Sequence, residues 1–155
     1  MTATKFIVKT LATAATLLAM ASAQAQMSPV GLWKTIDDKD GSAKAEIRIT
    51  EKTGVVSGKI EKVYRTTFKP TDTCDMCKDE RKGQLVLGLE IMRDLKKVEG
   101  QDVWEGGTIL DSESGTIYKA KVTPIEGGSK LEMRGFVGFS FLGRTQTWVR
   151  IVEAK

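Results

Sequence analysis

Apolar and polar residues alternate along most of the chain in short segments. The clearest segment is AKAEIRIT at residues 43–50, where Ile47 and Ile49 share a face with two alanines, and Glu46 and Arg48 lie on the opposite face. An alternation with a period of two places one face in the core and the other in water, as in a half-buried antiparallel strand. We therefore expect a β-strand at residues 43–50.

The same alternation recurs along the chain, interrupted by turns rich in glycine and aspartate such as DDKDG and DSESG. Glycine and aspartate favour tight turns, so the apolar runs between them are typical of a β-meander. Eight antiparallel strands are enough to close a barrel and remove exposed sheet edges. The sequence thus predicts an all-β, single-domain, antiparallel eight-stranded up-and-down barrel, with strands at residues 30–36, 43–50, 55–65, 84–95, 102–110, 116–123, 130–138 and 144–152.

One of these segments, QLVLGLEIMRDL at residues 84–95, is ambiguous. Its apolar run LVL and its glycine favour a strand, whereas Leu89, Met92 and Leu95 share a helical spacing. We expect a strand here. The preceding residues 66–83 form a long polar loop that contains both cysteines.

The N-terminal residues 1–25 have the pattern of a secretory signal peptide. Lys5 and Lys9 precede an uncharged run at residues 11–21, which is followed by A-x-A cleavage sites. The run is shorter than the roughly 20 apolar residues of a membrane span, and no second apolar stretch is long enough for one. We expect export to the periplasm and a barrel domain at residues 26–155 without a membrane span.

Charge and the absence of histidine exclude several classes of function. The formal net charge of +4 includes Lys5 and Lys9, which leaves +2 for residues 26–155, with both signs interspersed. A nucleic-acid partner would require a clustered basic face, so we expect none. The chain has no histidine, which removes Ser-His-Asp and Cys-His catalysis and histidine-containing zinc sites. We expect no enzymatic activity, no catalytic residues and no cofactor.

A first resemblance concerns the two ends of the predicted barrel. The segment GLW, from Gly31 to Trp33, opens the first predicted strand, and Arg150 lies in the last. The pair resembles the G-x-W motif and late arginine of the calycin superfamily, which includes the lipocalins. The resemblance implies a lipocalin-like barrel that Trp33 and Arg150 close by stacking, a contact that contributes about 0.5–2 kcal/mol. Trp148 is an alternative partner for Arg150.

A broader resemblance covers nearly all of residues 26–155. It is carried by GLWKTIDD, the Cys-x-x-Cys loop running into LVLGLEIM, the hairpin WEGGTILDSESGTIYKAKV and the closing RGFVGFSFLGRTQTWVR. These segments are similar to the DUF2147 family of uncharacterised exported bacterial proteins. The resemblance implies no catalytic or binding residues, because the family has no assigned function.

Cys74 and Cys77 are the only cysteines, and three interpretations compete. A disulfide is preferred, because exported compartments oxidise thiols and a turn brings this spacing within reach; so small a ring contributes about 2 kcal/mol. A metal site has only two thiolates here, and Cu(I) with Met76 or Met92 as a further ligand is its least demanding form. Redox catalysis usually comes with a βαβ context, which the chain lacks.

Large aromatic residues are the candidates for ligand contact. Trp104, Tyr118, Phe136 and Trp148 are candidates to line a cavity, although aromatic side chains also fill cores. We expect a monomer that binds a small apolar or amphipathic ligand in the barrel mouth. The alternatives are a structural or interaction module of the cell envelope with a filled barrel, and a Cu(I) protein that uses the two cysteines.

Overall fold

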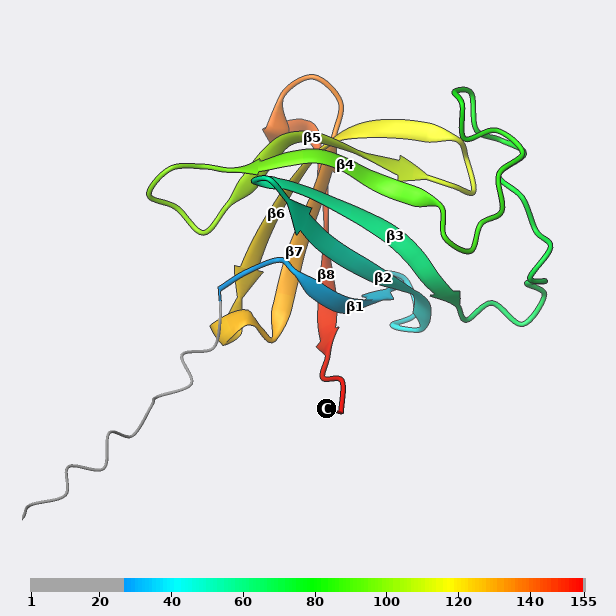
Figure 1. The fold of residues 1–155 in the computed structure, drawn as a ribbon, viewed down its shortest axis with the longest axis horizontal. Coiled ribbons are helices and arrows are strands. Elements are labelled where there is room, and N and C mark those ends of the chain that lie inside the picture. Colours follow the sequence, from blue (N-terminus) through cyan, green and yellow to red (C-terminus); the bar gives the residue numbers. More distant parts are fainter. Residues whose placement is uncertain (1–26, 155) are drawn as a thin grey trace, which may run out of the picture.

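The computed structural model describes residues 27–154, which form eight β-strands and two 3-10 helices (Figure 1). The 3-10 helices, η1 (Glu126–Gly128) and η2 (Ser140–Leu142), precede and follow β7. The strands are β1 (Gly31–Ile36), β2 (Ala43–Lys52), β3 (Val55–Val63), β4 (Glu90–Lys97), β5 (Trp104–Asp111), β6 (Thr116–Ile125), β7 (Lys130–Phe136) and β8 (Arg144–Ile151).

The predicted signal peptide, residues 1–25, lies outside the described residues. Within the described range, no helix has the length and apolar character needed to cross a membrane.

The eight strands close into one antiparallel barrel, as the alternation of apolar and polar residues predicts. Each strand pairs with the next, and β1 also pairs with β8, with Trp33 opposite Arg150. In Figure 1 the first strand, in blue, accordingly lies beside the last, in red. Because each of these strands has two neighbours, closure protects the backbone N–H and C=O groups that an edge strand would expose.

The up-and-down connectivity sorts the connections between the two ends of the barrel. The β2–β3, β4–β5 and β6–β7 turns lie at the end where β1 begins, and we call it the tryptophan end. The β1–β2, β3–β4, β5–β6 and β7–β8 connections lie at the other end, which we call the cysteine end. The longest connection, residues 64–89 between β3 and β4, is the cysteine loop, drawn in green in Figure 1.

One continuous hydrophobic core reaches from Cys74, Cys77 and Leu89 of the cysteine loop to the tryptophan end, which it fills. The side chains that alternate inward along the strands here are at most 4% exposed, and they include Trp33, Ile49, Val56, Leu95, Trp104, Val122, Leu131 and Trp148. Burying a side chain of this kind contributes about 1.5–3 kcal/mol relative to leaving it in water. The tryptophan end therefore supplies much of the hydrophobic stabilisation.

The predicted strand at residues 84–95 is wrong in its first half. β4 begins at Glu90, and residues 84–89 belong to the cysteine loop. Gly88 has a φ of +85°, which interrupts a strand, while Leu89 beyond it is buried in the core. The apolar run is therefore not a strand: Leu85 at its start is exposed, and Leu89 at its end is buried from a loop. The other seven predicted strands agree with the observed ones to within two residues at each end.

Candidate functional site

The tryptophan end is closed by Trp33 and Arg150. The guanidinium carbon of Arg150 lies 4.1 Å from the centroid of the Trp33 ring. The three guanidinium nitrogens also donate hydrogen bonds to backbone carbonyl oxygens of Ser28, Val30 and Gly128. Burial lowers the pKa of Arg150 below its ordinary value. Arg150 therefore ties the segment before β1 to the turn before β7.

Gly31 gives the guanidinium room to approach. Its φ is +138°, and an added Cβ would lie 2.5 Å from Nη1 of Arg150, so a side chain here would be strained and would collide. The indole nitrogen of Trp33 donates to the carbonyl oxygen of Pro29 at 2.7 Å. The pairing of β1 with β8 thus brings Gly31, Trp33 and Arg150 together, in the arrangement that their resemblance to calycins implies.

A hollow of about 340 Å³ lies beside this closure, and its side-chain donors Arg150 and Ser129 are already bonded within the protein. The guanidinium nitrogens of Arg150 already donate to carbonyls, and the hydroxyl of Ser129 donates to Glu126. Ligand sites of this size use a few polar groups to orient their ligand, and here they serve the closure. The hollow is lined by Ser28, Val30, Gly127, Gly128, Ser129, Arg150 and Val152.

At the cysteine end the inward-facing positions are half-exposed. Ile109 pairs with Tyr118 across β5 and β6. A Cβ added to Gly135 on β7 would lie 3.5 Å from Cβ of Tyr118 and 3.7 Å from Cγ2 of Ile109, so the three positions face one space. On β8, Gln146 pairs with the buried, inward-facing Met133. We call Ile109, Tyr118, Gly135 and Gln146 the mouth residues.

Exposure therefore changes along the inside of the barrel. All four mouth residues are half-buried, as are Ala45 and Val63, which pair with each other across β2 and β3. Inward-facing residues at the tryptophan end are almost fully buried. The mouth residues, Ala45 and Val63 are therefore less completely covered than the inward-facing positions at the tryptophan end.

Two polar groups belong to this mouth. Within the described chain, the hydroxyl of Tyr118 has no hydrogen-bond partner. The side-chain oxygen of Gln146 accepts a hydrogen bond from Nε1 of Trp148 at 3.3 Å, which leaves the amide nitrogen as a donor. A wall that is mostly apolar with a few polar groups is typical of small-molecule sites.

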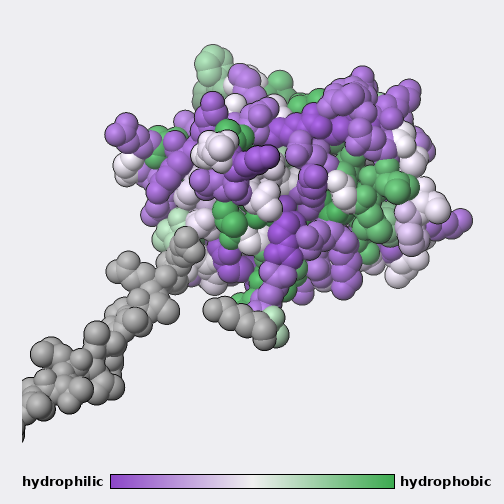
Figure 2. Space-filling view, in the orientation of Figure 1, coloured by the Kyte–Doolittle hydropathy of each residue, from purple (hydrophilic) through white to green (hydrophobic). Residues whose placement is uncertain are grey.

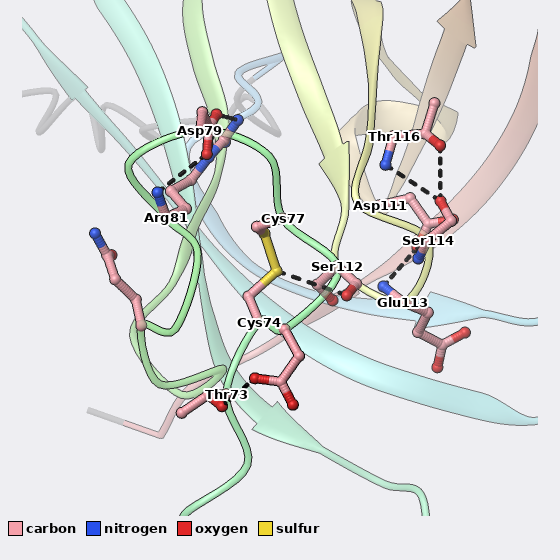
Figure 3. Close-up of a disulfide and its surroundings, with 12 residues drawn as sticks. Thr73, Cys74, Cys77, Asp79, Arg81, Asp111, Ser112, Glu113, Ser114 and Thr116 are labelled. Carbon is pink, nitrogen blue, oxygen red and sulfur yellow. Dashed lines mark hydrogen bonds and ion pairs between the residues drawn. A yellow bond between two sulfur atoms is a disulfide. The ribbon is translucent and has the colours of Figure 1, made fainter.

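The cysteine loop covers part of the same end (Figure 3). Cys74 and Cys77 form a disulfide with a Cα–Cα distance of 5.4 Å, and both are buried in the core cluster. The sulfur of Cys74 lies 3.6 Å from the carbonyl oxygen of Ser112 in the β5–β6 turn. A Cβ on Gly115 of that turn would lie 1.8 Å from the carbonyl oxygen of Met76, so the two backbones are in contact.

The disulfide leaves the Cu(I) interpretation without ligands in this state, because the thiolate is the form that binds metals. The two methionines also do not converge, since Met76 is exposed and Met92 is fully buried. In the described range no group of three histidine, cysteine, aspartate or glutamate residues is arranged to hold a metal ion.

An ion pair between a buried arginine and a partly exposed aspartate anchors the cysteine loop to the barrel (Figure 3). Arg81 is 2% exposed, and its Nη2 lies 2.6 Å from Oδ2 of Asp79. Nη1 of Arg81 donates to the carbonyl oxygen of Glu90, the first residue of β4, at 3.0 Å. The hydrogen bonds from Arg81 lower the pKa of Asp79 to about 2. We therefore assign this pair a structural role.

The four aromatic candidates for ligand contact do not gather in one place. Tyr118 is a mouth residue, and Trp148 reaches the mouth through its hydrogen bond to Gln146. Trp104 is buried at the tryptophan end, with Nζ of Lys97 5.3 Å from its ring centroid. Phe136 pairs with the exposed Lys119, so it lies on the outer face. The outward position of Phe136 was predictable, because residues 131, 133 and 135 of the same strand face inward and the next residue must face outward.

Sequence reasoning missed three of the mouth residues: Ile109, Gly135 and Gln146. A glycine and a glutamine in strands give no signal of their own. Their positions follow only from the strand register, which the pairing of β6 with β7 and of β7 with β8 supplies.

A comparison with protein families places the chain in a known group. The profile described as "Uncharacterized protein conserved in bacteria (DUF2147)" matches residues 31–150. The chain belongs to the DUF2147 family. The matched range begins at Gly31 and ends at Arg150, and it therefore spans the barrel up to its closing arginine.

The DUF2147 barrel has the fold of a lipocalin. It is similar to a solved structure, protein HP1028 from the human pathogen Helicobacter pylori, described as belonging to the lipocalin family. The TM-score is 0.68 at 17% sequence identity, over 80% of this chain and 83% of that chain. No curated protein matches the chain. At this identity the likeness shows the fold alone, so function must be argued from the site.

Proposed function

We propose that this DUF2147 protein is a non-catalytic exported protein that binds a small apolar or amphipathic ligand in the mouth of its barrel. One observation carries the proposal: the inward-facing residues are almost fully buried at the tryptophan end and half-exposed at the cysteine end. Barrels of about eight strands are either filled by side chains or hold one small ligand. The difference in exposure supports a barrel that is filled at the tryptophan end and takes its ligand at the cysteine end.

The mouth residues suggest the chemistry of the ligand. Ile109 and the bare backbone of Gly135 offer an apolar wall, while Tyr118 and Gln146 provide hydrogen-bonding groups beside it. A ligand with an apolar body and one polar end would bury its body against the wall and satisfy the unpaired hydroxyl of Tyr118. Because the core below is filled, the ligand enters only the cysteine-end part of the barrel.

Export is part of the proposal and rests on the N-terminal pattern. Lys5 and Lys9 before an uncharged run favour a signal peptide. A disulfide between Cys74 and Cys77 fits an oxidising compartment such as the periplasm. Cell fractionation of the full-length chain, with the mass of the secreted form measured, tests this part separately.

Ligand binding is tested by titrating the purified protein with the fluorescent apolar probe N-phenyl-1-naphthylamine. We expect saturable binding of one probe per chain. Gly135→Leu places a side chain in the mouth and should weaken binding at least tenfold. Glu132→Leu is the matched control, because Glu132 lies on the outer face of the same strand, and it should bind as the native protein does.

A smaller substitution at Gly135 and a search for a retained ligand complete the test. Gly135→Ala adds only a methyl group at ordinary contact distance from Tyr118, so it should fold even if the leucine variant does not. Native mass spectrometry of protein purified from the periplasm would show a ligand that is retained. Equal probe affinity in the native protein, Gly135→Leu and Gly135→Ala, with all three folded, would refute the proposed site.

A second candidate function, an interaction module of the cell envelope, is favoured by a different region. Four large apolar side chains project into solvent from the connection between β7 and β8. This surface lies at the cysteine end, where Gly143 closely approaches the carbonyl oxygen of the mouth residue Gly135.

A further inference from the structure

We propose that the β7–β8 connection, residues 137–143, inserts its apolar side chains into the surface of a phospholipid bilayer. We call this connection the apolar loop. It has no part in the closure at Arg150 or in the disulfide, and the proposal does not depend on ligand binding in the mouth.

The apolar loop concentrates the exposed apolar surface of the molecule. Val137, Phe139, Phe141 and Leu142 are 66%, 69%, 74% and 67% exposed. Phe139 and Phe141 stack with ring centroids 5.6 Å apart. In Figure 2 apolar atoms project at the upper edge of the molecule, where Figure 1 places this loop. Exposed apolar side chains scattered singly need no explanation, but a cluster of four marks an interaction site.

The loop is held in this projecting form by the barrel beneath it. Nε of Arg134 on β7 donates to the carbonyl oxygen of Ser140 at 2.5 Å, and its Nη1 donates to Oγ1 of Thr145 at 2.7 Å. A Cβ on Gly143 would lie 2.6 Å from the carbonyl oxygen of Gly135, so the loop leaves the barrel by a close backbone contact. The 3-10 helix η2 lies within the loop. The side chains are therefore presented from a structured support.

Cations without carboxylate partners lie beside the loop. Lys119 pairs with Phe136, the last residue of β7, and Lys121 pairs with Arg134. Lys119, Lys121 and Arg134 form no ion pair with any described residue. Like charges directly opposite each other across two strands are unfavourable, and an anionic group from outside would offset this cost.

The net charge on the outer face of β6 and β7 also depends on the acidic residues near it. Glu105 lies opposite Lys121 on the β5 side but makes no ion pair with it within the described chain. Asp38 in the β1–β2 turn is already paired with Arg144 at the end of the loop. Glu132 also lies on the outer face of β7, two residues before Arg134, and makes no ion pair within the described chain. The three cations therefore exceed the unpaired carboxylates on this face, Glu105 and Glu132, by one.

This combination suits a lipid surface better than a protein partner. Aromatic and aliphatic side chains that penetrate the interface, with lysine and arginine beside them at phosphate level, are the features of interfacial membrane anchors. A stable protein interface uses about 20–30 residues on each side, whereas here the apolar part is four side chains of one loop. Lipid phosphates would also give Lys119, Lys121 and Arg134 the anionic partners that they do not have within the described protein.

The test is co-sedimentation of the mature protein with vesicles of phosphatidylethanolamine and phosphatidylglycerol. We expect binding that weakens as salt rises. Phe139→Ser with Phe141→Ser should lower the partition coefficient at least tenfold. The matched control is Met76→Ser with Leu85→Ser, two exposed apolar residues of the cysteine loop, which should leave vesicle binding unchanged.

A charge-reversal pair tests the cations. Lys119→Glu with Lys121→Glu should weaken binding several-fold and reduce its dependence on salt. Lys59→Glu with Lys96→Glu reverses two exposed lysines on β3 and β4, away from the loop, and should have little effect. Ile109→Trp, which fills the mouth from β5 and leaves the β7 support of the loop unchanged, should still bind vesicles. The vesicle test can therefore fail without any failure of the proposed ligand site.

Three results would overturn the inference. The first is no sedimentation with the vesicles. The second is equal binding by the native protein and the double phenylalanine variant. The third is self-association in solution that the double phenylalanine variant abolishes, because the loop would then serve a contact between copies of the chain.

Discussion

The two ends of this barrel are built from the same strands and differ in how their inward positions are filled. At the tryptophan end the inward positions hold Trp33, Trp104 and Leu131, all almost fully buried. At the cysteine end they hold Gly135 and Ala45 among larger residues, all half-exposed. Large side chains fill the interior where the arginine closes it, whereas residues of mixed size stay half-exposed where the long connections lie.

This difference shows that the alternation of apolar and polar residues specifies a barrel, but not how far side chains fill its interior. The alternation of apolar and polar residues is the same at both ends, because it reports only which face points inward. Whether an inward position is filled depends on side-chain volume and on what the connections cover. The two ends should therefore respond differently to substitution.

The largest effect is expected at Trp33. Trp33→Ala removes a fully buried indole from the core and its stacking with Arg150. We expect a loss of about 3–5 kcal/mol in the free energy of unfolding, measured by urea denaturation. A loss below about 1 kcal/mol would show that the tryptophan end does not carry the stability of the barrel.

Arg150→Ala should have the next largest effect. It removes the hydrogen bonds to the carbonyls of Ser28, Val30 and Gly128 together with the cation–π contact. We expect a loss of about 2–3 kcal/mol, seen as a lower Tm. Arg144→Ala, which breaks an exposed ion pair with Asp38, is the control and should cost less than about 1 kcal/mol.

Removal of the disulfide should act locally at the cysteine end. Cys74→Ala with Cys77→Ala removes a cross-link of sequence separation 3, for which the chain-entropy estimate is about 2 kcal/mol. Hydrogen exchange should accelerate within residues 64–89 and change little in β1 and β8. Uniform acceleration across the strands would contradict a local role.

Acid should weaken the anchor of the cysteine loop. The pKa of Asp79 is lowered from 3.8 to about 2 by its hydrogen bonds with Arg81. A depressed carboxyl pKa stabilises the fold above pH 3.8, and this contribution is lost as the pH falls from about 4 towards 2. The stability difference between the native protein and Asp79→Asn should therefore be constant near neutral pH and shrink over that window. A difference that does not change with pH would contradict the ion pair.

Tyr118→Phe should have the smallest effect on stability. The hydroxyl has no hydrogen-bond partner among the described residues, so its loss should change the free energy of unfolding by less than about 0.5 kcal/mol. The affinity for an amphipathic fatty acid should fall several-fold, while the affinity for N-phenyl-1-naphthylamine stays the same. An equal loss for both ligands would argue against a hydrogen bond from Tyr118.

Much of the fold could be predicted from the sequence, and particular residues show where prediction ended. Residues 43–50 alternate strictly, and β2 begins at Ala43. Residues 84–89 are mostly apolar and so resemble a strand, but they form an irregular loop in which Leu89 is buried and Leu85 is exposed. The pairing of Trp33 with Arg150 could be predicted from the sequence, because the first and last strands of a closed barrel are neighbours.

The candidate site was predicted less well, for a physical reason. Trp104 and Phe136 were chosen by residue type, but register places one in the filled core and the other on the outer face. Gly135 matters because it lacks a side chain, which composition cannot reveal. Which strand positions share one space is a property of pairing between segments far apart in the sequence.

The most direct test compares two isoleucine methyl groups that both point inward. Ile49 is fully buried towards the tryptophan end, and Ile109 is a mouth residue. With methyl-labelled isoleucine and a soluble gadolinium chelate, we predict strong relaxation enhancement for Ile109 and almost none for Ile49. Equal protection of both methyl groups would mean that the barrel is filled at both ends, and it would contradict the account.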